Sequence, residues 1–288
     1  MLLTIHDAAS YCYGGGKTFD AALPTAVFIH GAQNDHSVWA LQSRYFAHHG
    51  FNVLAVDLPG HGRSKGTALS SVEAMAAWLV ALLDAAGVER ALLIGHSMGS
   101  LVALEACALL KGSKRVIGLA MLGTTYPMKV ADALLSTARD DEPAAIDMVN
   151  IWSHARANLL QPQNPVAPLA GVSTMGVARR LMQRMSALNP ARLFHTDFSA
   201  CNAYAGGEAA AAALRCPVLL IFGSKDMMTP PRSTKLLTAA VAAATTSRVV
   251  QVDAGHSLMA EQSGAVLDAL FGFARSVLNG AETGAETT

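Results

Sequence analysis

One stretch decides the fold of this chain: Leu92-Leu93-Ile94-Gly95-His96-Ser97-Met98-Gly99-Ser100-Leu101-Val102-Ala103-Leu104. Its apolar beginning is typical of a buried strand, and its second half has the apolar spacing of a helix. The G-x-S-x-G pattern between them predicts a tight strand–turn–helix junction with Ser97 in a strained, positive-φ conformation. The flanking glycines let strand and helix approach without Cβ clashes. The stretch therefore predicts an exposed serine hydroxyl above a sheet, beside a helix N-terminus.

Continuous apolar runs alternate with helical patterns along much of the chain. Strand-like runs occupy residues 26–29, 52–56, 116–122, 217–222 and 248–252, and helical patterns lie near 38–49, 70–86, 232–243 and 260–278. Strands of this kind indicate a parallel sheet that is covered on both faces. Residues 2–13 alternate loosely and predict a hairpin at the sheet edge. The predicted fold is α/β, with a mostly parallel eight-stranded sheet.

The alternation of strand-like runs and helical patterns is interrupted between about residues 124 and 207. Helical patterns near 129–139, 143–159, 176–187 and 190–204 have no strand-like run between them, and a loop with three prolines occupies 161–168. We interpret 125–206 as a helical cap inserted over the sheet, with 1–124 and 207–279 forming the core domain. Residues 280–288 are small and polar and are expected to form a flexible tail.

Composition limits the classes of partner. Hydrophobic residues make up 52% of the chain and charged residues 15%, which argues against disorder. Lys and Arg together number 21, as do Asp and Glu, so there is no basic field for nucleic acid or acidic membranes. We expect a small-molecule partner, no nucleic acid, no membrane, and a monomer or homodimer.

Cysteine usage and the N-terminus bear on location. The four cysteines are scattered without metal-ligand spacing, so neither a disulfide framework nor a metal site is expected. The N-terminus lacks the pattern of a signal peptide, and the longest apolar run, 74–83, is about half as long as a membrane span. These features together favour a cytoplasmic protein.

A serine hydroxyl is nearly un-ionised at neutral pH, so Ser97 needs a general base within hydrogen-bond reach. His256 follows the last strand in a glycine-flanked loop, and Asp226 follows the penultimate strand. Because parallel strands deliver their carboxyl ends to one rim, the three side chains should meet there. Their order is the one expected of this architecture, and the alternative acid position, 123–125, holds no carboxylate. An Asp in such a loop also often caps the next helix.

Acyl transfer further requires donors for the developing oxyanion. We expect the backbone N–H groups of Ala32 and Met98 to supply them. The side chains expected to line a substrate pocket are Gln33, Met128, Trp152, Met175 and Leu258, although an aromatic or Met in a helix is more often ordinary packing. His30 and His96 are interpreted as structural, and Asp57, His61 and Arg63 as stabilising their own turn.

Five motifs in order resemble the α/β-hydrolase superfamily, and more narrowly its small capped bacterial carboxylesterases and lactonases. They are His30-Gly31-Ala32, the run Asp57-Leu58-Pro59-Gly60-His61-Gly62-Arg63-Ser64, residues 95–99, Asp226, and Gly255-His256. The resemblance spans 26 to about 275. It implies a helical cap, Ser97 as nucleophile, and ester hydrolysis without a cofactor. Serine at position 97 disfavours the halide and epoxide hydrolases that attack with aspartate.

Two other activities remain open at this point. The same three residues could open a lactone or cleave a carbon–carbon bond in a vinylogous diketone, although no arginine adjoins the elbow to hold the carboxylate of such a diketone. A ligand receptor of the same fold with little turnover belongs to a different class. The sequence after Ala32 lacks the further glycines of the H-G-G-G pattern of hormone-sensitive-lipase-like hydrolases, and this departure makes esters of bulky tertiary alcohols less expected.

Overall fold

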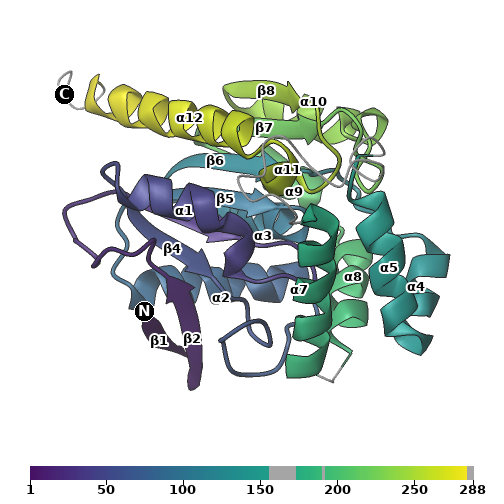
Figure 1. The fold of residues 1–288 in the computed structure, drawn as a ribbon. Coiled ribbons are helices and arrows are strands. Elements are labelled where there is room, and N and C mark those ends of the chain that lie inside the picture. The colour runs from purple at the N-terminus through teal and green to yellow at the C-terminus, as the bar shows by residue number, and fades with distance from the viewer. Residues whose placement is uncertain (156–172, 190–191, 284–288) are drawn as a thin grey trace.

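A computed structural model describes residues 1–155, 173–189 and 192–283 and confirms the predicted fold class (Figure 1). The sheet has eight strands in the order β1-β2-β4-β3-β5-β6-β7-β8. Pairing is antiparallel from β1 through β2 to β4 and parallel from there to β8. The strands are β1 Leu2–Ile5, β2 Ala8–Tyr13, β3 Thr25–Ile29, β4 Asn52–Val56, β5 Ala91–His96, β6 Val116–Leu122, β7 Val218–Gly223 and β8 Ser247–Val252.

Most of the helices fall close to the ranges that the sequence predicts. They are α1 Ala40–Ala47, α2 Val72–Ala85, α3 Met98–Leu109, α4 Asp132–Asp140, α5 Glu142–Trp152, α7 Thr174–Leu188, α8 Leu193–Ala203, α9 Gly207–Ala212, α10 Lys235–Ala244, α11 Leu258–Glu261 and α12 Ser263–Thr283, with 3₁₀ turns at His36–Trp39 and Pro231–Ser233. The short helix α9 was not predicted, and the predicted ranges 143–159 and 190–204 extend into residues outside the described part of the chain. Helix α12 continues to Thr283, so the predicted boundary between the last helix and the tail, at residue 280, lies too early in the sequence. The three-proline loop at 161–168 lies outside the described residues.

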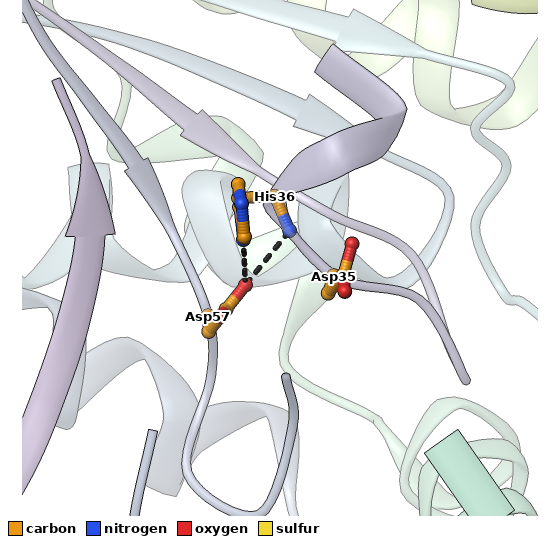
Figure 2. Close-up of side chains that lie close together, drawn as sticks. All are labelled: Asp35, His36 and Asp57. Carbon is orange, nitrogen blue, oxygen red and sulfur yellow. Dashed lines mark hydrogen bonds and ion pairs between the residues drawn. The ribbon is translucent and has the colours of Figure 1, made fainter. Parts of the chain in front are cut away.

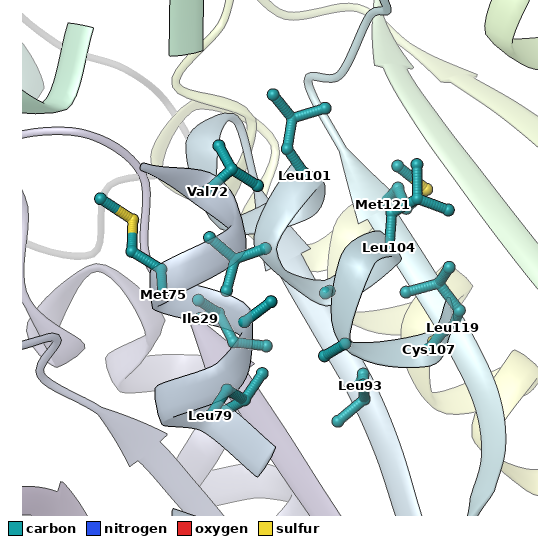
Figure 3. Packing of buried hydrophobic residues seen from close by; sticks show 14 of the residues in the cluster. Ile29, Val72, Met75, Leu79, Leu93, Leu101, Leu104, Cys107, Leu119 and Met121 are labelled. Carbon is teal, nitrogen blue, oxygen red and sulfur yellow. The ribbon is translucent and has the colours of Figure 1, made fainter. Parts of the chain in front are cut away.

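The two faces of the sheet bury separate apolar clusters because successive strand residues point to opposite sides. In β3, Val27 and Ile29 pack towards α2 and α3, whereas Ala26 and Phe28 pack towards α1 and α12. Figure 3 shows the first face, where Leu101 and Leu104 of α3 lie over strand residues. Burial on both faces explains why the central strands carry apolar runs without alternation.

Local signals fix the ends of α2. The Ser71 hydroxyl accepts a hydrogen bond from the backbone N–H of Ala74 at 3.1 Å, which satisfies one of the free donors of the first turn. Gly87, just past the other end, has a φ of +63°, a conformation that favours glycine. Both agree with the capping predicted from the sequence.

Between β6 and β7 the described residues form helices and no strand. Helices α4, α5, α7 and α8, teal to green in Figure 1, gather at one end of the sheet. They bury a third apolar cluster, which includes Leu134, Ile146, Met182 and Phe194. Among the described residues, no helix combines the length and apolar character needed to cross a bilayer.

Candidate active site

The sharp turn at Ser97 has the predicted strand–turn–helix geometry. Ser97 directly follows β5 and precedes α3, with φ +52° and ψ −121°. Its backbone N–H donates to the carbonyl of Leu122 at 2.9 Å, which fixes the turn to the neighbouring strand. A Cβ on Gly95 would overlap the carbonyl of Gly99, and one on Gly99 would overlap the carbonyls of Ile29 and His30. The close approach of β5 and α3 therefore requires glycine at both positions.

Replacing Gly95 with alanine is expected to destabilise the protein by about 1–3 kcal/mol or more, because the added Cβ meets rigid backbone atoms. The measurement is the free energy of unfolding in urea. Gly112→Ala is the matched control, since a Cβ at Gly112 meets no atom within 4 Å and its φ is not positive. Equal stability of the two variants would contradict the packing argument for the elbow.

The structure brings His256 and Asp226 into contact. Nδ1 of His256 lies 2.8 Å from Oδ2 of Asp226, and both side chains are buried. The other carboxylate oxygen of Asp226 accepts from the backbone N–H groups of Met228 and Thr229, each at 2.8 Å. The Thr229 hydroxyl donates to Oδ2 at 2.7 Å. The carboxylate is thus held on both oxygens, with one of them directed at His256.

Electrostatics keep Asp226 ionised. Burial raises the pKa of this carboxyl, but the adjacent His256 and the hydrogen bonds from Thr229 outweigh that and lower it to about 2. A negative charge therefore stands beside Nδ1 of His256 at neutral pH. Such a charge orients an imidazole and stabilises its cation.

Glycines shape the space around His256. A Cβ on Gly123, at the end of β6, would lie 3.1 Å from the His256 ring, so a larger residue there would displace the imidazole. Gly255 is equally constrained, because a Cβ would come within 2.8 Å of the Ser153 carbonyl. The Glu261 carboxylate accepts from the N–H groups of Gly255 (3.1 Å) and Ala155 (3.0 Å). The histidine loop is thereby fixed to the end of α5.

The two residues expected to supply oxyanion donors, Ala32 and Met98, are close to Ser97. Ala32 lines the same two cavities as Ser97, and among the described residues its backbone N–H has no acceptor. Met98 is the first residue of α3, where backbone N–H groups have no partner within the helix. These two main-chain groups can therefore receive a negative charge next to Ser97.

Two cavities meet at Ser97. The larger, about 200 Å³, is mainly apolar, and Lys129 brings one positive charge to its lining. The smaller, about 60 Å³, has a more polar lining from the end of α5 and the His256 loop. Ser97, His256, Ala32, Phe198 and Met228 line both.

Two of the five predicted pocket side chains line these cavities. Met128 and Trp152 contribute to the wall of the larger one. Met175 and Leu258 line neither, and Leu258 is buried in the apolar cluster beneath α12. Gln33 is also absent from both walls. Its φ of +56° turns the side chain towards α7, where Nε2 donates to the Met182 carbonyl and to Ser186.

Gln33 belongs to a buried polar connection between the core and α8. Its backbone N–H donates to Oδ2 of Asp197 at 2.8 Å, and Nε2 of His61 lies 2.9 Å from the same oxygen. Nδ1 of His61 faces the Pro59 carbonyl at 3.1 Å. Because both ring nitrogens face acceptors, His61 is protonated. Burial lowers the pKa of His61, but Asp197 and these hydrogen bonds raise it above 6.5. The prediction that His61 acts within its own turn is therefore incomplete.

Asp197→Asn is expected to cost about 3–5 kcal/mol of stability at pH 6, because it leaves the buried imidazolium without its counter-charge. The folded-state pKa of His61 is raised, so its contribution is full below 6.5 and is lost as pH rises through the raised value. The difference between wild type and variant in urea unfolding should shrink from pH 6 to pH 9. Asp147→Asn, which breaks the exposed pair with Arg179, is the control and should change little. A pH-independent difference would contradict the ion pair.

One group of described side chains has the composition of a metal site. Asp35, His36 and Asp57 have ligand-type atoms within 4.8 Å of one another. However, Nδ1 and the backbone N–H of His36 each lie 2.8 Å from Oδ1 of Asp57. Figure 2 shows these two contacts as dashed lines. Asp35 accepts from Ser37 and lies 3.6 Å from a guanidinium nitrogen of Arg184. The group is best explained as bracing for this loop.

A third cavity, about 740 Å³, lies at the opposite end of the sheet, by the first residues of β6, β7 and β8. Its lining includes Cys107 and Cys216 but neither Ser97 nor His256. The cavities at Ser97 are smaller, but they alone among these combine a strained serine with a histidine–carboxylate pair.

Sequence reasoning missed several residues around the site. Thr229 could have been found, since an Asp followed three residues later by Thr is a common turn pattern. Asn150, His154 and Asp197 gave no such signal. The first two line the cavity, and Asp197 meets His61, only because α5 and α8 pack on the core.

Comparisons with known proteins bear on the family and the fold. The chain is similar to a dihydrolipoyllysine-residue acetyltransferase component of an acetoin cleaving system from Cupriavidus necator, 34% identical over 39% of this chain and 29% of that protein. It is also similar to a pimeloyl-[acyl-carrier protein] methyl ester esterase from Serratia marcescens, 28% identical over 74% of this chain and 80% of that protein. The chain spans only 29% to 55% of the length of three curated relatives, one of which is the Cupriavidus necator protein.

A solved structure extends the fold comparison. The enol-lactonase from Burkholderia xenovorans superposes with a TM-score of 0.80, at 21% identity, over 96% of this chain and all of that one. The sequence model described as "Alpha/beta hydrolase family" matches residues 26–269. Because that match covers most of the sequence, the chain belongs to the alpha/beta hydrolase family.

Proposed function

We propose that this hydrolase cleaves carboxylic esters of small, largely apolar substrates through Ser97, His256 and Asp226, without a cofactor. The observation that carries the proposal is the 2.8 Å contact between His256 Nδ1 and Asp226. In this contact Nδ1 of the imidazole binds the carboxylate, so Nε2, the other ring nitrogen, is available for proton transfer. His256 and Ser97 line the same cavity, so a substrate carbonyl there can reach both.

In the proposed reaction, Nε2 of His256 takes the hydroxyl proton of Ser97 as Oγ attacks the carbonyl carbon. The backbone N–H groups of Ala32 and Met98 donate hydrogen bonds to the oxyanion. His256 then passes its proton to the leaving alcohol, and an acyl-enzyme remains. Water, deprotonated by the same histidine, releases the acid and restores the serine. Asp226 keeps the imidazole in the required tautomer throughout.

We also propose that residues 125–206 form a cap that shapes the substrate pocket. Leu134 of α4, Trp152 of α5 and Phe198 of α8 contribute apolar walls to the 200 Å³ cavity. An apolar wall next to a few polar groups is the usual composition of a small-molecule site. Short acyl chains fit a cavity of this volume better than long ones.

A series of p-nitrophenyl esters from acetate to dodecanoate tests the proposal. We expect kcat/KM to be highest for short chains and to fall as the chain outgrows the cavity. The same series should include a lactone and a vinylogous diketone with a carboxylate, the two rival substrates. Absence of turnover with every ester, or faster cleavage of the diketone than of any ester, would contradict the proposal that this protein is an esterase. A stoichiometric burst with almost no steady state would point instead to a receptor.

A further inference from the structure

Three residues in the lining of the smaller cavity beside Ser97 each carry one buried polar atom without a hydrogen-bond partner among the described residues. These atoms are Nδ1 of His96, Oδ1 of Asn150 and Nε2 of His154. Their exposed fractions are 5%, 6% and 1%. Unpaired buried polar atoms are rare in folded proteins and call for an explanation such as a ligand.

Each of the two histidines has one ring nitrogen that is paired and one that is not. Nε2 of His96 faces the His256 carbonyl at 2.9 Å, and Nδ1 of His154 faces the Asn150 carbonyl at 2.8 Å. A carbonyl only accepts, so each of these nitrogens carries the ring hydrogen. Burial lowers the pKa of His96 to about 3 and also lowers that of His154, so both rings are neutral. The other nitrogen of each ring is therefore an acceptor.

We infer that the 60 Å³ cavity is a subsite for a short substrate group that carries a hydroxyl or N–H donor close to the scissile carbonyl. The inference rests on the proposed function, because it places the carbonyl at Ser97. The volume admits a few non-hydrogen atoms, and the described lining offers acceptors but no cation for a carboxylate. A hydroxyl would satisfy one of the three acceptors and a matching methyl group none, and an acceptor left unpaired is how a polar site rejects an apolar analogue.

Two matched substrate pairs test the inference and locate the donor. Compounds 2-hydroxyethyl butanoate and propyl butanoate place a hydroxyl or a methyl on the alcohol side. Methyl 3-hydroxypropanoate and methyl butanoate do so on the acyl side. For each pair, the kcat/KM of the hydroxyl ester is divided by that of the methyl ester. This ratio is then divided by the same ratio for hydroxide-catalysed hydrolysis, which removes the difference in intrinsic reactivity of the two esters. We expect one pair to favour the hydroxyl by roughly tenfold or more.

Variants connect the preference to the acceptors. The double variant Asn150→Leu/His154→Phe keeps apolar side chains of similar shape and should bring the ratio close to one. If the double variant does not fold, the single variant Asn150→Leu replaces it in the test. This substitution is nearly isosteric and should also lower the ratio. Ile151→Ala is the matched control, since Ile151 lies next to Asn150 in α5 but is 51% exposed. Because the same preparation is assayed with both esters of a pair, the ratio does not depend on what fraction of a variant is correctly folded.

The outcomes separate this inference from the function beneath it. A ratio near one for both pairs in the wild type means that the cavity holds only solvent, and it overturns the inference. A preference that survives in the double variant overturns it as well. Absence of turnover with all four esters contradicts the proposed function instead.

Discussion

Replacing Ser97 with alanine is expected to lower kcat for p-nitrophenyl ester hydrolysis by about 10⁴- to 10⁶-fold. Without Oγ no acyl-enzyme forms, and only substrate binding and the oxyanion donors at Ala32 and Met98 remain. The second measurement is the intact mass after treatment with a fluorophosphonate, which should increase for the wild type and stay unchanged for the variant. The modified residue should be Ser97.

Ser113→Ala is the control for this change, because Ser113 is exposed just beyond the far end of α3. It should keep both kcat and the fluorophosphonate adduct. A fall of less than about tenfold in Ser97→Ala would contradict the assignment of the nucleophile. Ser97→Gly should also be inactive but more stable than Ser97→Ala, since glycine adopts φ +52° without the roughly 1–3 kcal/mol of strain stored by other residues.

The elbow, the sheet and the histidine–aspartate pair follow from the sequence because each rests on local signals. Apolar runs place β3, β4 and β5 in the sheet interior, and the glycines at 95 and 99 admit α3. Parallel pairing then carries the residues after each strand to one rim, which suffices to bring Asp226 and His256 together. No long-range contact had to be known in advance.

The cap contacts could not be predicted in this way. Gln33 directly follows Ala32 and was expected in the pocket, but its positive φ directs the side chain to α7, more than 140 residues further along the chain. The pair between His61 and Asp197 likewise depends on how α8 docks. Periodicity identifies which face of a helix is apolar, and it does not specify the polar partners that the helix meets.

The Asp226→Asn substitution is expected to lower kcat by about 10⁴-fold while the fold stays intact. Oδ1 of Asp226 accepts from two backbone N–H groups, so the amide oxygen of Asn must take that place. The amide nitrogen then faces Nδ1 of His256 and donates to it. The ring hydrogen has to move to Nε2, the atom that should accept the proton of Ser97. The variant therefore holds the histidine in the wrong tautomer.

Nitrogen NMR of labelled histidine distinguishes this cause from simple unfolding. The hydrogen of the neutral His256 ring should be on Nδ1 in the wild type and on Nε2 in Asp226→Asn, and the rate of fluorophosphonate labelling should fall in parallel with kcat. Asp253→Asn is the matched control, because Asp253 lies in the loop that carries His256 but is exposed and pairs with Lys225. If Asp226→Asn kept near-normal kcat, or lost it without a change of tautomer, Asp226 would only stabilise its own turn. The two hydrogen bonds on Oδ1 would then be its whole role, and the carboxylate that orients His256 would have to be sought elsewhere.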